Sequence, residues 1–159
     1  MHSRRIGAAL LLTVAVTATG ALAAETDSFR GTTEGSFFSH GEYRQARISF
    51  ERTGNTLHHI RFEIRVRCPS GQHRSRVGHI RTVKVHDGKF KFDGAVVGQP
   101  SGPPPEGTFR RSEFIRGRIG DDHASGVVQL STTLDGKGNE AAGGKTCRSG
   151  KVEWTAAAL

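Results

Sequence analysis

The strongest constraint on the fold is a strict alternation of apolar and charged residues between positions 60 and 68. The apolar side chains there are Ile60, Phe62, Ile64, Val66 and Cys68, and the charged ones are Arg61, Glu63, Arg65 and Arg67. Successive side chains of a β-strand point to opposite faces, so this segment predicts a strand with one buried and one solvated face. Such strands are typical of antiparallel sheets. A shift of one residue would bury three arginines, so the register is strongly determined.

Alternation continues along the chain, and no segment shows the periodicity of a helix. We expect further strands over residues 29–33, 47–52, 77–85, 89–92, 95–97, 109–119, 124–133 and 146–156, and a short extended piece over residues 36–38. Turn-forming residues separate them, notably in segments 53–56, 87–88 and 120–122, and Asp93-Gly94 is expected to interrupt one strand. About eight or nine short strands predict a single antiparallel β-sandwich, with a closed barrel as the alternative. The Pro-rich segment 98–107 and the Gly-rich segment 135–145 are predicted to be loops.

The last expected strand contains a conflict of faces. Cys147 has the opposite parity to Val152 and Trp154, yet all three are expected in the core. Glycine tolerates the backbone conformation that a β-bulge requires, so a bulge at Ser149-Gly150 would bring the three side chains to one face.

The N-terminus has the pattern of a secretion signal. Arg4 and Arg5 are followed by an apolar run over residues 6–16, and Ala21-Leu22-Ala23 provides the small residues of a cleavage site. The run is too short for a stable membrane span, so no integral membrane segment is expected after cleavage. We therefore expect residues 1–23 to be a signal peptide and residues 24–159 to be one secreted domain, extracellular or associated with the cell envelope. Cleavage would reduce the formal net charge from +8 to +6, because the segment removed contains two arginines.

Cys68 and Cys147 are the only two cysteines of the chain. Outside the cytoplasm an isolated pair favours an intramolecular disulfide. Neither cysteine lies in a CxxC motif or beside a histidine, so a metal site or a catalytic thiol is the weaker interpretation. A disulfide that closes a loop of this length stabilises the fold by about 4 kcal/mol in the chain-entropy model.

Several segments resemble a large group of small secreted bacterial proteins, frequent in actinobacteria and without an assigned function. The matching pieces are segments 29–33, 60–68 and 87–90, Gly117 followed by segment 124–126, and the closing signature C-x-S-G-x-x-x-W-x-A over residues 147–156. The resemblance implies a β-sandwich and an exported protein, and it implies no catalytic residue. This chain departs from the group in its many arginines and histidines.

The charged face of the central strand is the candidate binding site. Arg61, Arg65 and Arg67 share that face, and Lys84 on a neighbouring strand is expected to extend it. Alternate residues of a strand are about 7 Å apart, which is close to the spacing of phosphates along a nucleic-acid strand. The sequence thus favours a non-catalytic module that binds anionic cell-wall or extracellular polymers through salt-sensitive contacts. Phe50, Phe62, Phe90 and Phe92 alternate with charged residues and are expected in the core, which argues against a base-stacking platform.

Enzymatic and metal-binding signatures are absent from the sequence. It contains no nucleophile elbow, no P-loop and no HExxH motif, and no cofactor or metal is expected. His58 and His59 are adjacent on a predicted strand, so they are expected on opposite faces. The alternative functions are a secreted hydrolase, with His59, Glu63 and Arg61 as base, acid and phosphate clamp, or a protein-binding inhibitor that uses the Pro-rich loop.

Overall fold

The computed structural model describes residues 25–98, 108–135 and 146–159, and there the chain is all-β. The expected signal peptide, most of the Pro-rich loop and most of the Gly-rich loop lie outside the described residues. The strands are β1 (Thr26–Ser39), β2 (Glu42–Thr53), β3 (Thr56–Arg67), β4 (His73–His86), β5 (Lys89–Gly98), β6 (Thr108–Ile119), β7 (His123–Asp135), β8 (Thr146–Arg148) and β9 (Val152–Ala158). Within these described ranges, no helix is long and apolar enough to cross a membrane.

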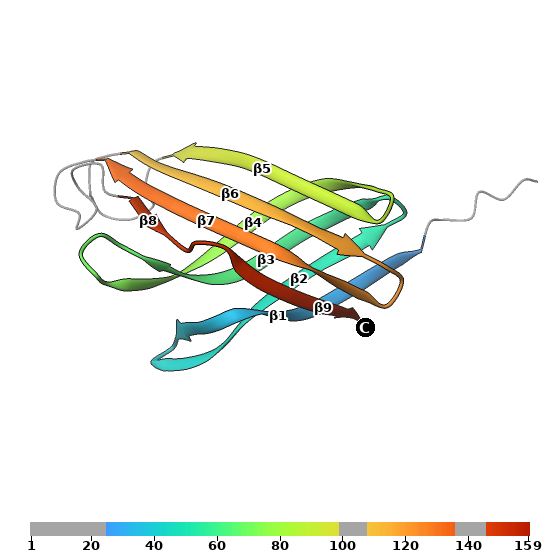
Figure 1. Cartoon of the computed structure of the whole chain (residues 1–159), viewed down its shortest axis with the longest axis horizontal. Coiled ribbons are helices and arrows are strands. Elements are labelled where there is room, and N and C mark those ends of the chain that lie inside the picture. Colours follow the sequence, from blue (N-terminus) through green and yellow to red (C-terminus); the bar gives the residue numbers. More distant parts are fainter. Residues whose placement is uncertain (1–24, 99–107, 136–145) are drawn as a thin grey trace, which may run out of the picture.

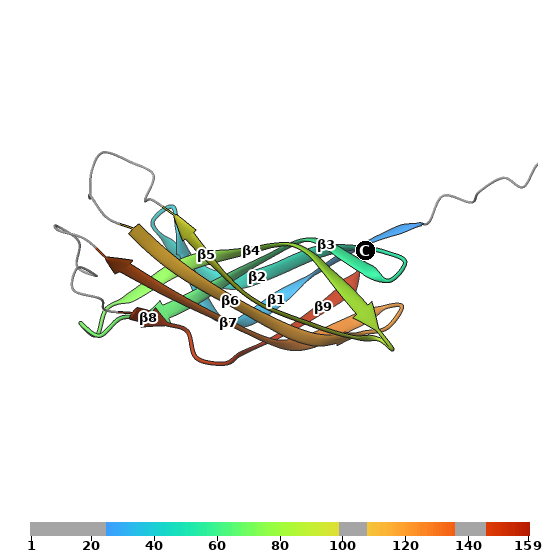
Figure 2. The same ribbon diagram turned by 90° about the horizontal axis from the view of Figure 1, so that it is seen from above.

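The strands form two layers, as the antiparallel β-sandwich prediction requires (Figures 1 and 2). One layer has the order β1-β2-β3-β4 and the other the order β5-β6-β7-β9. The layers are joined at both sides: β9 pairs with β1 over five residue pairs, whereas β4 and β5 share only two. The short strand β8 bridges the layers at one end, because it pairs with both β3 and β7.

A chain of aromatic side chains fills the space between the layers. The rings of Phe29 and Phe50 are stacked with centroids 5.0 Å apart, and the ring of Trp154 lies 6.0 Å from those of both Phe50 and Phe90. Trp154 is only 2% exposed, which confirms its expected place in the core. Aromatic side chains bury large apolar areas, so this row contributes strongly to holding the two layers together.

Two expected interruptions prove to be continuous strand. β1 runs through the expected gap near residue 34, with a register shift between Thr32 and Ser36. β5 runs through Asp93-Gly94, where the ring of Phe92 covers the glycine: a Cβ there would lie 2.4 Å from the ring. The prediction of a break at Gly94 was therefore wrong, because this glycine makes room for an aromatic ring and not for a turn.

The expected last strand is divided in two instead of bulged. β8 ends at Arg148 and β9 begins at Val152, with Gly150 between them at a φ of 70°, which glycine adopts readily. Ser149 secures the break, because its N–H donates to the carbonyl of Leu130 and its Oγ accepts the N–H of Leu130. Cys147 and Trp154 are both buried, so a change of strand resolves the conflict of faces.

The predicted disulfide is present between Cys68, which follows β3, and Cys147 in β8. The two residues are 79 positions apart in the chain and both are buried. The bond therefore links the end of β3, a largely buried strand, to β8, which has only three residues.

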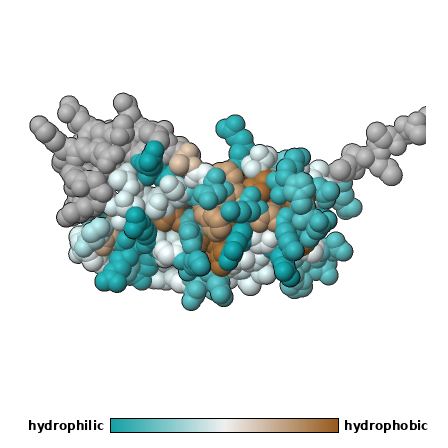
Figure 3. Space-filling model, turned by 45° about the horizontal axis from the view of Figure 1, so that its top comes forward, coloured by the Kyte–Doolittle hydropathy of each residue, from teal (hydrophilic) through white to brown (hydrophobic). Residues whose placement is uncertain are grey.

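On one side of the molecule, β4 and β5 are joined at only two residue pairs. After the turn at Asp87-Gly88 the two strands diverge into different layers. Figure 3 turns the β5 side of the molecule forward and shows apolar side chains at its centre, between hydrophilic ones. Along most of this side, contacts between side chains must therefore hold the two layers together, whereas backbone hydrogen bonds do so between β9 and β1.

Candidate functional site

The structure places the four predicted anion-binding residues along one layer but not in one cluster. Arg61, Arg65 and Arg67 are exposed on the outer face of β3, as expected. Arg67 lies six residues beyond Arg61, about 20 Å along the strand. Lys84 is paired with Thr56, about 16 Å from Arg61 in the opposite direction, and its Nζ donates to the Thr56 hydroxyl. Only Arg61 reaches the main hollow of this face.

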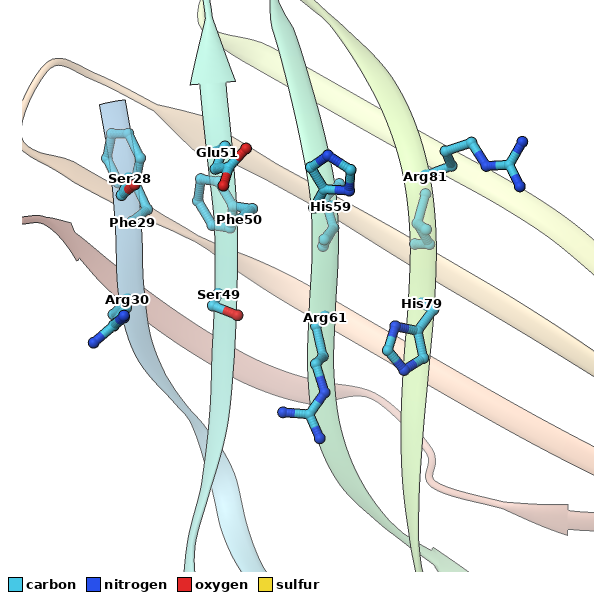
Figure 4. Close-up of a pocket in the computed structure, with 12 residues that line it drawn as sticks. Ser28, Phe29, Arg30, Ser49, Phe50, Glu51, His59, Arg61, His79 and Arg81 are labelled. Carbon is cyan, nitrogen blue, oxygen red and sulfur yellow. The ribbon is translucent and has the colours of Figure 1, made fainter. Parts of the chain in front are cut away.

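That hollow, which we name the central basic pocket, is a depression of about 620 Å³ across β1–β4 (Figure 4). Its polar side chains are Ser28, Arg30, Ser49, Glu51, His59, Arg61, His79 and Arg81. Three arginines thus line a depression whose lining holds one carboxylate, and Figure 4 shows the guanidinium of Arg81 directed away from Arg61. Arg30 and Arg81 make no ion pair with any described residue.

The register of the four strands builds the lower row of the pocket. Arg30 is paired with Ser49, Ser49 with Arg61, and Arg61 with His79, so the four residues form a line across the strands. The small side chain of Ser49 leaves space between two arginines. Figure 4 shows Arg30 and Arg81 at opposite ends of the pocket, with Arg61 and His79 between them. Of these residues, only Arg61 was predicted from the sequence as a binding residue.

A local irregularity in β3 brings His58 and His59 to the same face. His59 has a φ of 51°, and β2 and β3 change register beside it. Leu57 and Ile60 are both buried, so the two histidines between them lie outside, with ring centroids 6.4 Å apart. The expectation of opposite faces was wrong, because a residue with positive φ breaks the alternation. Across the described residues, no group of three or more His, Cys, Asp or Glu side chains is arranged to hold a metal ion.

The positive potential of the pocket acts on His79. Burial lowers the pKa of this imidazole, and the charges of Arg61 and Arg111 lower it further. His79 is therefore neutral at neutral pH and serves as a hydrogen-bonding group, while the arginines provide the charge.

Glu63 is on the outer face of β3 but is only 2% exposed. Its carboxylate accepts two hydrogen bonds from Arg44, of 2.6 and 2.7 Å, and one of 3.2 Å from the N–H of Arg47. Burial acts to raise the pKa of Glu63, but the hydrogen bonds and charge of Arg44, the Arg47 N–H and the charge of Arg61 outweigh burial and lower it. Glu63 is thus held ionised beneath Arg44, which removes the acid from the hydrolytic set considered with His59 and Arg61.

Glu113, on β6, is a second buried carboxylate and is 3% exposed. Its Oε1 accepts the N–H of His79 on the open side of β4, at 3.2 Å, and lies 2.8 Å from Nε of Arg111. Arg111 in turn reaches the carbonyl of Val77, at 3.5 Å. Burial raises the pKa of Glu113, and the His79 N–H and the charge of Arg111 only partly oppose it. Glu63 has the equivalent role at the point where β2 and β3 stop pairing. Each glutamate thus accepts a backbone N–H, that of Arg47 or of His79, that has no partner on a neighbouring strand.

We expect the Glu113→Gln and Glu63→Gln variants to alter the pH dependence of stability in opposite directions. The pKa of Glu113 is raised from 4.5, so wild-type protein should lose stability relative to Glu113→Gln as the pH rises above that value. The pKa of Glu63 is lowered from 4.5, so wild-type protein should gain stability relative to Glu63→Gln as the pH rises toward that value, and keep the gain above it.

Urea unfolding followed by Trp154 fluorescence, from roughly pH 3 to pH 8, measures both differences. In each variant the uncharged amide leaves an arginine without its counter-ion. This adds a constant, pH-independent difference to the free energy of unfolding. Parallel stability curves for wild type and both variants would contradict the assignment.

Exposed aromatic residues lie beside Arg65, at the tip of the β1–β2 hairpin. Phe38 is 46% and Tyr43 65% exposed, and their ring centroids are 4.9 Å apart. The guanidinium of Arg65 lies 5.8 Å from the centroid of the Tyr43 ring, and the N–H of Phe38 donates to Ser75 Oγ on β4. We name Phe38, Tyr43 and Arg65 the aromatic corner; it borders a hollow of about 320 Å³. Of these three residues, only Arg65 was predicted from the sequence.

No protein-family model matches this chain, and no curated protein is similar to it. Function is therefore inferred from the geometry of the two features on the outer face of β1–β4. Both lie on the solvated side of β3, where Arg61 and Arg65 are four residues apart. Together they present cations and exposed rings along one face of the sandwich.

Proposed function

We propose that the protein is a non-catalytic module that binds anionic polymers across the outer face of β1–β4. The observation that carries the proposal is the central basic pocket, where Arg30, Arg61 and Arg81 line one depression with a single carboxylate, Glu51. Guanidinium groups bind phosphate, sulfate and carboxylate groups through paired hydrogen bonds. Arg30 and Arg81 make no ion pair with any described side chain and are available for such contacts.

The spacing of the cations favours a polymer over a small anion. Arg30 and Arg81 lie on β1 and β4, the first and last strands of this layer (Figure 4). Neighbouring strands are about 4.8 Å apart, so these two arginines are separated by about 14 Å across the layer. One phosphate group cannot contact both, whereas a chain of regularly spaced anions contacts them in turn.

The aromatic corner adds a preference for polymers that contain rings. Exposed aromatic rings stack on nucleic-acid bases and on the flat faces of sugars, and arginine beside them adds charge. Phe38 and Tyr43 are placed to provide such contacts next to Arg65. A polymer with both anionic groups and rings should therefore bind more tightly than a chain of phosphates alone.

We further propose that the protein works outside the cytoplasm, free or associated with the cell envelope, as a member of the secreted bacterial β-sandwich group. The N-terminal pattern of residues 1–23 and the C-terminal signature of residues 147–156 support this proposal. A buried Cys68–Cys147 disulfide is compatible with an oxidising compartment.

Replacing Arg30 and Arg81 together by glutamine should weaken polymer binding at least tenfold. Each lost phosphate contact also removes one released counter-ion, so the slope of log K against log salt should become shallower by about 1.5. The measurement is a titration of fluorescent single-stranded DNA, heparin and long-chain polyphosphate with oxidised protein at several salt concentrations.

Arg148→Gln/Lys151→Gln is the matched control, because it also removes two positive charges and both residues are exposed outside the pocket. A Tyr43→Ala variant should weaken binding of DNA or heparin while leaving polyphosphate binding unchanged. Equal losses in the two double variants would show that net charge alone drives binding, and the proposed site would be wrong.

A further inference from the structure

We propose that the protein bridges two anionic polymer chains, because a second basic surface lies on the opposite layer. This inference rests on the proposed function of the first surface and adds a second site to it. The second surface, which we name the β5–β6 groove, is formed by Lys89 and Lys91 on β5 and by Arg116 and Arg118 on β6.

The four cations of the β5–β6 groove face each other directly across two strands. Lys89 is paired with Arg118, and Lys91 with Arg116. Like charges placed directly opposite on neighbouring strands destabilise a sheet. All four side chains are exposed, and none makes an ion pair with a described residue. Local conflicts of this kind are expected at functional sites, where a ligand supplies the missing charge.

The shape of the groove suits an extended ligand. It is an open hollow of about 720 Å³ that continues over β7 to β9, where Glu153 is the only acidic side chain of its lining. Gly117 and Gly126 are paired beneath its floor, and their missing side chains face the core. Phe90 and Trp154 pack against the inner side of Gly117, where a Cβ would lie within 3 Å of either ring. The cations thus lie along the β5–β6 side of the groove, and Ser125, Val127 and Thr155 line its other side.

The groove is compact in comparison with the central basic pocket. Lys89 and Lys91 are two residues apart, about 7 Å, and their partners lie about 5 Å away on β6. This places four positive charges within the length of two or three phosphate groups. The Nζ of Lys91 lies 5.7 Å from the centroid of the Phe114 ring, which orients its charge over the sheet.

The two basic surfaces lie back to back, with the core between them. The central basic pocket is on the outer face of β1–β4, and the groove is on the outer face of the layer that contains β5 and β6. Packed sheets are about 10 Å apart, so a polymer on one face does not occupy the other without wrapping around the molecule. Two separate chains can each occupy one face, and binding at both would link them.

The experiment is a two-chain capture assay with the full oxidised protein. Long-chain polyphosphate is fixed to beads, protein is added, the beads are washed, and fluorescent polyphosphate is then offered. Wild-type protein should retain the fluorescent chain on the beads. A variant in which Lys89, Lys91, Arg116 and Arg118 are all glutamine should bind the beads but capture at least tenfold less of the second chain. The Arg30→Gln/Arg81→Gln variant should show the same loss of capture.

The outcomes separate this inference from the proposed function. Binding to the beads without capture by wild-type protein would overturn the bridging proposal and leave the proposed function standing. Capture by the groove variant at the wild-type level would also overturn it. No binding of wild-type protein to any polymer would refute the proposed function itself. Sedimentation of the free protein tests whether linkage comes from self-association; capture by a dimer that survives loss of the groove counts against the inference. Trp154 fluorescence confirms that each variant is folded, and Lys91→Gln/Arg116→Gln replaces the quadruple variant if it is not.

Discussion

Replacement of both Cys68 and Cys147 by alanine is expected to lower the free energy of unfolding by about 4 kcal/mol. The bond joins residues 79 positions apart, so its loss restores a large conformational freedom to the unfolded chain. In the folded state, removal of the disulfide affects β8 most, because this strand has three residues and a single residue pair with β3. Urea unfolding of the variant and of the oxidised wild-type protein measures the difference.

Reduced wild-type protein is the control for the loss of the two sulfur atoms from the core. It should unfold at nearly the same urea concentration as the alanine variant, because both lack the cross-link. An unchanged unfolding midpoint in both samples would show that the disulfide does not stabilise the fold.

Gly126→Ala should destabilise the protein by about 3 kcal/mol, since the new methyl group has no space. A Cβ at this position would lie 2.0 Å from the carbonyl oxygen of Arg116 and 2.6 Å from the Cα of Gly117. Gly126 is paired with both Gly117 and Trp154, so relief of the clash requires β6, β7 or β9 to separate. Thermal unfolding measures the loss.

Gly120→Ala is the matched control, because the nearest atom to its Cβ would be 3.7 Å away, at an ordinary contact distance. This variant should shift stability by less than about 0.5 kcal/mol. Similar losses in the two variants would mean that the clash at Gly126 does not determine the effect, because Gly→Ala by itself lowers the entropy of the unfolded chain and stabilises the fold.

Alternation in the sequence was enough to predict the strands, their buried faces and the class of fold, but not how they associate. The parity of Ile60 to Cys68 located the core of β3, and Trp154 was correctly assigned to the interior. Glycine was the main source of error: at Gly94 it accommodates a ring inside a strand, whereas at Gly150 it accompanies a real break. The difference depends on whether a side chain lies over the glycine, as that of Phe92 does at Gly94, and the alternation pattern does not indicate this.

The candidate site was predictable only as far as one strand extends. Arg61 was identified because its own strand alternates, whereas Arg30, His79 and Arg81 join it through strand order and register. The burial of Glu63 likewise depends on Arg44, which is brought over it by the β1–β2 hairpin. Arg44 and Glu63 are 19 residues apart in the chain and become neighbours only after the layer has formed.

The two buried glutamates, Glu63 and Glu113, affect how readily copies of the protein aggregate at high local concentration. Exposed N–H and C=O groups along a strand are templates on which another chain can add, and this is a common route to aggregation. Here the open side of β4 is occupied by Glu113 and Arg111, and that of β2 by Glu63. A polymer that collects this protein raises its local concentration steeply, and the occupied backbone groups of β2 and β4 oppose pairing of those strands with neighbouring copies.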